Sequence, residues 1–199
     1  MRSYDIYHVD AFTSEPLKGN AAAVIPDAEG LSDGAMQAIA REMNLSETAF
    51  VFPPESAGCD LSVRFFSPAI EVPFCGHATV ALHHVRAAEL GLPCGDSVQM
   101  TKAGPVPVRV GLDGKSSSVS FTMRDFRFAE VMGREERRRI LGALGADMEN
   151  WDARFPMQRV YAGVAVALTS RAALDALAPD MGALSRLSSE LGFDDFVVF

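Results

Sequence analysis

The sequence predicts a mixed α+β fold with more strands than helices in its first part. Runs of β-branched and aromatic residues bounded by Gly, Pro or Asn predict strands, and apolar residues spaced three and four apart predict helices. Three strand-like runs between residues 98 and 123 include an Asp-Gly turn at residues 113–114, which predicts an antiparallel meander. The 199 residues suffice for one large domain or two small ones.

The elements of the first part follow from local signals. Ser32 can cap a helix whose apolar positions share one face. Gly76 opens a second helix, which runs to about Leu90 and is closed by Gly91. Strands are expected at residues 4–13, 21–25, 48–52, 61–66, 98–102, 106–112 and 117–123.

The pattern changes after a soft boundary near residues 124–132, so we expect a first lobe at residues 1–125 and a second at 126–199. A charged helix begins at Gly133, a strand follows at residues 159–168, and another helix begins near Ser170. The last seven residues are an apolar, β-favouring run. Because domain ends are usually polar, we expect this run to belong to something longer.

Charge and composition exclude several classes of function. The formal charge of −8 gives no basic stripe to neutralise a phosphate backbone, so nucleic acid is not an expected partner. No run approaches the roughly 20 apolar residues that cross a bilayer, and the N-terminus does not resemble a signal peptide. Three cysteines without a CxxC pair argue against a disulfide framework. We therefore expect a cytoplasmic protein without a membrane partner.

Glu47 is the first candidate for chemistry. It lies between Leu45 and the apolar pair at residues 49–50, where a helix ends and a strand begins. Lost hydration would favour the neutral carboxyl and raise its pKa toward working pH, which suits a group that accepts and returns a proton. The residues alone also allow a solvated loop glutamate, and such glutamates are commoner.

The second candidate is the helix start at residues 73–79. Gly76 allows close approach of the backbone, and the unpaired N–H groups of a helix start can hold a carboxylate or a developing enolate. His77 could donate to that ligand or shuttle a proton. Glycine is also common at helix boundaries that have no functional role, so this signal is weak by itself.

A metal site is not expected. Cys75, His77, His83 and His84 are close in sequence, but they lack a second ligand pair at zinc spacing, and the two adjacent histidines point to different helix faces. The sequence contains neither a Walker-type nor a GxGxxG loop, so no nucleotide cofactor is expected either.

Several motifs together resemble the phenazine-biosynthesis isomerase-like family, the PhzF type. They are highly specific in order and spacing over residues 4–84, and the resemblance from 97 to 199 is looser but continuous in element order. The matching segments are residues 9–13, 19–24, 36–48, 63–68 and 71–79.

The resemblance implies a diaminopimelate-epimerase-like α+β fold. In such a fold two similar lobes each have a curved, mostly antiparallel sheet around a central helix, with the active site between them. It also implies a cofactor-independent, typically homodimeric isomerase of trans-2,3-dihydro-3-hydroxyanthranilate. Carried over by position, Glu47 is the acid/base, and Gly76 and His77 contact substrate. Asn20 and Ser46, within the same motifs, are further expected substrate-binding residues.

The chain departs from the family pattern in two places. Ala21 stands where the family usually has proline after Gly-Asn, which should loosen that loop without abolishing it. The family's Asp-Pro-x-Thr-Gly-Ser-Ala motif, which opens a helix across the cleft, does not occur before Phe199. We therefore expect an incomplete second lobe and a chain that is catalytically poor by itself.

The leading expectation is an isomerase that binds a small carboxylated substrate and transfers a proton through Glu47. One alternative is a non-catalytic binding or interaction protein that keeps the fold. Another is a thiol-dependent racemase that uses Cys75, although no second Cys-Gly motif is present.

Overall fold

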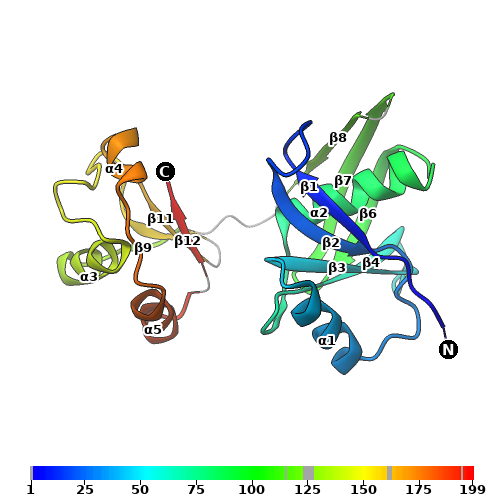
Figure 1. The fold of residues 1–199 in the computed structure, drawn as a ribbon, viewed down its shortest axis with the longest axis horizontal. Helices are drawn as coiled ribbons and strands as arrows, with labels where there is room; N and C mark the ends of the chain where they lie inside the picture. Colours follow the sequence, from blue (N-terminus) through cyan, green and yellow to red (C-terminus); the bar gives the residue numbers. More distant parts are fainter. Residues whose placement is uncertain (1, 115, 123–127, 161–162, 194) are drawn as a thin grey trace. The chain divides into compact units, whose positions relative to one another are not determined.

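The computed structural model describes residues 2–114, 116–122, 128–160, 163–193 and 195–199. The chain divides into two compact units, Met1–Arg124 and Asp125–Phe199 (Figure 1). Among the described residues, no helix has both the length and the apolar character needed to span a bilayer. Each unit has its own sheet and its own hydrophobic clusters.

The first unit contains one eight-stranded sheet. Its order is β1-β2-β3-β4-β6-β7-β8, with the short β5 paired to β4. Among its described strands the β2–β3 and β4–β6 pairs alone are parallel, so the predicted mostly antiparallel sheet is confirmed. The strands are β1 (Tyr7–Ala11), β2 (Asn20–Ile25), β3 (Glu47–Phe52), β4 (Leu61–Phe66), β5 (Glu71–Val72), β6 (Gly95–Thr101), β7 (Gly104–Asp113) and β8 (Ser116–Phe121).

The helix α2 (Gly76–His84) is the central helix that this sheet curls around (Figure 1). It packs against β1, β2, β3 and β8, and Ala78, Ala81 and Leu82 are fully buried on it. A π-helical turn, Val85–Glu89, extends the helical run to the expected end near Leu90. The predicted central helix is thus confirmed for the first unit.

The helix α1 (Asp33–Met43) covers another part of the sheet. Its buried residues Met36 and Ala40 pack in a cluster with aromatic side chains of β3 and β4. The Ser32 hydroxyl accepts a hydrogen bond from the Ala35 backbone N–H at 3.2 Å, so the predicted cap is confirmed. At the other end Asn44 adopts the left-handed conformation, with φ 52°, and the chain then enters β3.

The second unit has a four-stranded sheet in the order β12-β11-β10-β9, with a separate core. The largest fully buried side chains of this core are Ile140, Leu141 and Met157. Its elements are β9 (Phe128–Val131), α3 (Arg134–Leu144), β10 (Gln158–Val160), β11 (Gly163–Val166), α4 (Arg171–Asp175), α5 (Met181–Leu191) and β12 (Asp195–Val198).

The sequence expectations for this unit need two corrections. The single strand expected at residues 159–168 is wrong, because β10 and β11 are two strands that pair antiparallel. The elements β9 and α5 were not expected from the local pattern. The helices beginning at Gly133 and Ser170 are confirmed as α3 and α4, and the terminal apolar run forms β12.

Three strands of the second unit repeat the arrangement of three strands in the first. In both, an antiparallel pair is followed by helical structure and then by a strand that returns parallel to the second member. Glu47 opens β3 opposite Ala22, and Asp195 opens β12 opposite Gly163. The helix before each strand ends in a left-handed residue three positions earlier, Asn44 or Gly192. The two similar lobes are therefore visible in strand register.

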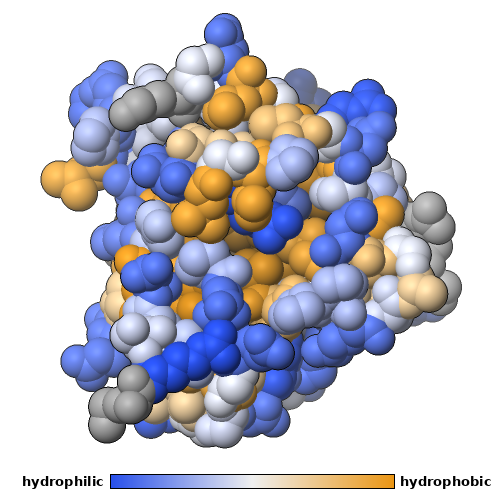
Figure 2. Space-filling model, turned by 90° about the vertical axis from the view of Figure 1, so that its right-hand side faces the viewer, coloured by the Kyte–Doolittle hydropathy of each residue, from blue (hydrophilic) through white to orange (hydrophobic). Residues whose placement is uncertain are grey.

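Hydrophobic side chains also lie on the surface. Figure 2 shows one face on which hydrophobic residues are gathered mostly toward the middle, with hydrophilic residues around much of the outline. In the first unit the most exposed large hydrophobic residues are Leu17, Phe12 and Ile70. Leu17 and Phe12 also have positive φ, of 63° and 64°, in the segment after β1.

Candidate active site

Glu47 is the first residue of β3. The left-handed turn at Asn44 redirects the chain out of α1, and pairing with Ala22 then fixes the start of the strand. Its side chain retains 21% of its exposure, so the carboxylate is largely covered but reachable from solvent. The expected junction of helix and strand at this residue is confirmed, and Glu47 is part of the sheet instead of a solvated loop.

Cys75 and Gly76 form the start of α2. Cys75 is the N-cap residue, with extended backbone angles and a buried side chain. A side chain at Gly76 would place its Cβ 3.3 Å from the Phe121 ring, which is tighter than ordinary contact. Gly76 therefore lets β8 close against the helix start, a packing role that adds to the backbone approach expected from the sequence.

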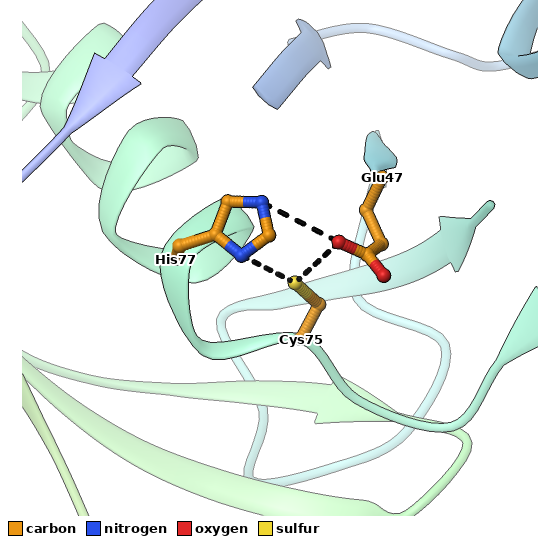
Figure 3. A group of neighbouring side chains, drawn as sticks. All are labelled: Glu47, Cys75 and His77. Carbon is orange, nitrogen blue, oxygen red and sulfur yellow. Dashed lines mark hydrogen bonds and ion pairs between the residues drawn. The ribbon is translucent and has the colours of Figure 1, made fainter. Parts of the chain in front are cut away.

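The side chains of Glu47, Cys75 and His77 meet at this helix start (Figure 3). The Cys75 thiol donates to Glu47 Oε2 at 3.4 Å, and Cys75 Sγ lies 3.3 Å from His77 Nδ1. The other ring nitrogen, Nε2, lies 3.4 Å from the same Glu47 oxygen. Three groups that can carry protons thus form a closed triangle, although they come from separate parts of the sequence.

Burial and charge set the protonation of this triangle. Burial, reinforced by the negative charge of Glu47, raises the pKa of the Cys75 thiol far above its usual range, against the opposing backbone N–H groups of Ala78 and His77. Burial also lowers the pKa of His77, although Glu47 and the Ala21 carbonyl favour its charged form. A neutral thiol and a neutral imidazole are therefore the expected state of Cys75 and His77 at neutral pH.

The two remaining expected residues differ in their relation to this triangle. The Ser46 hydroxyl lies 3.1 Å from His77 Nε2, so Ser46 extends the hydrogen-bonded group. Asn20 is exposed at the first position of β2 and pairs with Ala11 in the sheet. The group next to His77 is the backbone of the neighbouring residue Ala21.

A buried chain of hydrogen bonds supports the helix start from inside the sheet. His83 Nε2 lies 3.0 Å from Gln99 Oε1, the Gln99 amide donates to Thr79 at 3.2 Å, and the Thr79 hydroxyl donates to the Cys75 carbonyl at 2.7 Å. The same carbonyl also accepts from the Thr79 backbone N–H at 3.0 Å. Sequence reasoning missed this chain, because Gln99 reaches the helix only through the pairing of β6 within the sheet.

The expected divergence of the two adjacent histidines is confirmed. His83 points into the core toward Gln99, whereas His84 bonds through Nδ1 to Ser117 of β8 at 2.9 Å. Neither joins Glu47, Cys75 and His77, whose oxygen, sulfur and nitrogen ligand atoms lie within 4.8 Å of one another. In the described part of the chain, a possible set of metal ligands therefore includes Glu47, which is distant in sequence from the cysteine and histidines near residues 75–84.

One hollow on the described surface lies away from the triangle. It has a volume of about 750 Å³ and is lined by β1, α2 and β8, without Glu47, Cys75 or His77. Among its polar side chains, Asp10 accepts a hydrogen bond from the Leu17 backbone N–H, and His84 bonds to Ser117. Among the described residues, the triangle is the group in which an acidic side chain, a cysteine and a histidine converge, so it is the candidate active site.

This geometry fits proton transfer. A carboxylate that is partly open to solvent can accept a proton from a carbon acid, and the thiol and imidazole beside it can stabilise or share the charge. The helix start adds its positive dipole end, which favours an anionic group nearby.

Comparison with known proteins gives one consistent family. Residues 9–196 match the profile of the phenazine biosynthesis-like protein family, PhzC-PhzF. An uncharacterised isomerase of Clostridium acetobutylicum is 38% identical over the whole chain, which covers 67% of that protein. The trans-2,3-dihydro-3-hydroxyanthranilate isomerase of Pseudomonas chlororaphis is 38% identical over 89% of this chain and 62% of its own length.

The solved structures show the same likeness. A PhzF-family protein of Bacillus anthracis superposes with a TM-score of 0.78 at 26% identity, over 96% of this chain and 64% of that protein. The chain thus spans about two thirds of the length of the proteins it matches.

Proposed function

The chain belongs to the phenazine biosynthesis-like family, and we propose that it acts as an isomerase on a small carboxylated substrate, with Glu47 as the acid/base. The observation that carries the proposal is the triangle of Glu47, Cys75 and His77 at the start of α2. The triangle brings together Glu47 and the helix start at residues 73–79, the two candidates for chemistry that the sequence indicates.

In the proposed reaction, a Glu47 oxygen takes a proton from a carbon of the substrate, and the electron pair of the broken C–H bond moves into the neighbouring conjugated system. The resulting carboxylic acid returns the proton to a different carbon, which completes the isomerisation. The substrate is unchanged in composition, and the step needs only proton donors and acceptors, so the proposal includes no cofactor.

The neighbours of Glu47 support this role. The protonated Cys75 thiol donates to Oε2 at 3.4 Å, which fixes the position of the carboxylate before substrate binds. His77 Nε2 lies 3.4 Å from the same oxygen, and the Ser46 hydroxyl lies 3.1 Å from that ring nitrogen, so Ser46 orients the imidazole beside the carboxylate. The N–H groups at the start of α2 would face the negative charge that develops on the substrate.

The substrate class is proposed from the matched isomerase of Pseudomonas chlororaphis, whose name gives trans-2,3-dihydro-3-hydroxyanthranilate. Such a molecule carries the carboxylate that a helix start can hold. The acidic balance of the chain, with a formal charge of −8, means that local dipoles and not net charge must bind an anion.

Solvent deuterium exchange tests the proposal. The purified chain is incubated in D₂O with trans-2,3-dihydro-3-hydroxyanthranilate and related small carboxylates, and label uptake is followed by mass spectrometry. Glu47→Gln keeps the size of the side chain but cannot accept the proton, so we expect uptake to fall by about 10²–10⁴-fold. Glu42→Gln, the same change at an exposed position of α1, is the matched control and should leave uptake unchanged.

Wild-type uptake no faster than that of Glu47→Gln would contradict the proposal. Ligand binding without any exchange would favour the alternative of a non-catalytic binding protein. A thiol-dependent racemase predicts inactivation by iodoacetamide at Cys75. That alternative rests on the contact of Cys75 with His77, but the raised pKa of the buried thiol opposes it.

A further inference from the structure

We propose that Glu47, Cys75 and His77 form a three-ligand binding site for a zinc-class divalent ion, and that the ion and the substrate compete for this site. The three side chains supply one oxygen, one sulfur and one nitrogen ligand atom within 4.8 Å of one another. The inhibition part of this inference rests on the proposed function, whereas the binding part does not.

The separations of the ligand atoms fit a tetrahedral ion. Zinc bonds of about 2.3 Å to sulfur and about 2.0–2.2 Å to nitrogen and oxygen place neighbouring ligand atoms roughly 3.4–3.6 Å apart. Cys75 Sγ lies 3.4 Å from Glu47 Oε2 and 3.3 Å from His77 Nδ1. These two separations match a tetrahedral ion to within a few tenths of an ångström, and the ligand atoms of Glu47 and His77 have to close from a separation of at most 4.8 Å to the same range.

The surroundings already hold the ligands in place. With Nδ1 as the ligand, Nε2–H would remain free to donate to the Ser46 hydroxyl at 3.1 Å, and metal-bound histidines usually have such an outer partner. The Cys75 backbone is fixed by the two hydrogen bonds that its carbonyl accepts from Thr79. Ligands fixed in this way lose little conformational freedom when an ion binds.

The donor atoms decide which ions fit. A thiolate and an imidazole favour Zn²⁺ over Mg²⁺ and Ca²⁺, which prefer oxygen ligands. Three protein ligands converge among the described residues, so a fourth position would be open to water, as in zinc sites that bind exchangeable ligands. The partial exposure of Glu47 places this position on the solvent side.

Zinc binding displaces a proton. The Cys75 S–H bond breaks, its electron pair forms the S–Zn bond, and the proton leaves to solvent. The ion also takes the Glu47 oxygen that the proposed reaction needs as its base. Zinc and proton transfer are therefore mutually exclusive at this carboxylate, and zinc should act as a competitive inhibitor.

Competition with a chromophoric chelator measures binding without reference to activity. We expect one Zn²⁺ per chain, proton release on binding, and an affinity that falls at least about tenfold in Cys75→Ala and in His77→Gln. Cys59 and Cys94 lie outside the triangle, so a Cys59→Ser/Cys94→Ser double variant is the matched control and should bind zinc as the wild type does. An excess of Mg²⁺ should not displace the zinc.

Co²⁺ gives a second measurement that does not depend on how stable the variants are. In the wild type and in the cysteine control, Co²⁺ should produce a thiolate-to-metal charge-transfer band. Circular dichroism verifies the fold of Cys75→Ala, and the band should be absent from that variant. The absence of stoichiometric binding, or binding that is equal in Cys75→Ala and wild type, would overturn the site.

The deuterium exchange assay then tests the regulatory part. Zinc should raise the apparent KM for substrate, and a chelator should reverse the effect. Tight zinc binding with unchanged exchange would overturn the competition while leaving the metal site intact. Exchange that is lost in Glu47→Gln but unaffected by saturating zinc would also overturn the competition. Failure of the inhibition is therefore distinguishable from failure of the proposed function.

Discussion

At the residue scale, the candidate site depends on how three short segments meet. Glu47 and the pair Cys75–His77 could be chosen from the sequence, because each lies at an element boundary with unusual surroundings. The contacts among these three residues could not be predicted from the sequence, because they depend on the packing of α2 against β2 and β3. The support from Gln99 was also beyond sequence reasoning, because a buried glutamine in a strand has no distinctive local pattern.

His83 makes stability depend on pH. Burial lowers the pKa of His83 to about 4, from about 6.5 in an exposed histidine. The unfolded chain therefore binds a proton that the folded chain rejects. Stability from this group is fully present above pH 6.5 and is lost as the pH falls toward 4, by roughly 2 kcal/mol between pH 7 and pH 5.

Urea unfolding at pH 7 and pH 5 measures this effect. His83→Gln removes the titrating group but keeps an amide that can donate to Gln99. We expect the variant to be less stable at pH 7 but to lose little further stability at pH 5. An equal loss in wild type and variant would contradict the assignment to His83.

At the element scale, the junction between α1 and β3 positions Glu47. The sequence predicted α1 well, because the Ser32 cap and the helical spacing are local signals. The split of residues 159–168 into β10 and β11 was not predicted, because the stretch is mostly apolar and has valines on both sides of Gly163. Its reversal is set by pairing in the sheet, where Gly163 lies so close to Asp195 that an added Cβ would be 3.1 Å from that residue.

Asn44 offers a test of this junction. Its left-handed conformation, with φ 52°, costs most residues about 1–2 kcal/mol, whereas glycine adopts it freely. Asn44→Gly should therefore keep the free energy of unfolding within a few tenths of a kcal/mol, and Asn44→Ala should lower it by about 1 kcal/mol. Chemical denaturation compares the two variants. Equal stability of the alanine and glycine variants would show that the turn does not constrain the chain.

At the scale of the whole molecule, the two units have separate hydrophobic clusters. The first unit's clusters surround α2 and α1, and the second unit's cluster joins α3 and α5 to its sheet. The repeated strand register shows that both units are built on the same plan. The fold class could be predicted from the sequence because many local motifs agree. The repeat could not, because equivalent positions of the two units, such as Asn44 and Gly192, share a backbone conformation but differ in residue type.

Separate cores predict separate unfolding. Leu82→Ala in α2 removes a fully buried side chain and should destabilise the first unit by about 2–5 kcal/mol. Leu141→Ala is the matched change in α3 of the second unit. Hydrogen exchange with mass spectrometry should show lost protection confined to the unit that carries each substitution. Loss of protection in both units from either variant would mean that they unfold as one.

The central claim is that Glu47, and not Cys75, carries the proton. The most direct measurement compares solvent deuterium uptake by substrate in Glu47→Gln and Cys75→Ser, with the fold of each variant verified by circular dichroism. Because the buried thiol has a raised pKa and only donates to the carboxylate, we expect Cys75→Ser to retain uptake within about tenfold of the wild type. Glu47→Gln should reduce uptake to background. The reverse result, with uptake retained in Glu47→Gln and abolished in Cys75→Ser, would contradict this account.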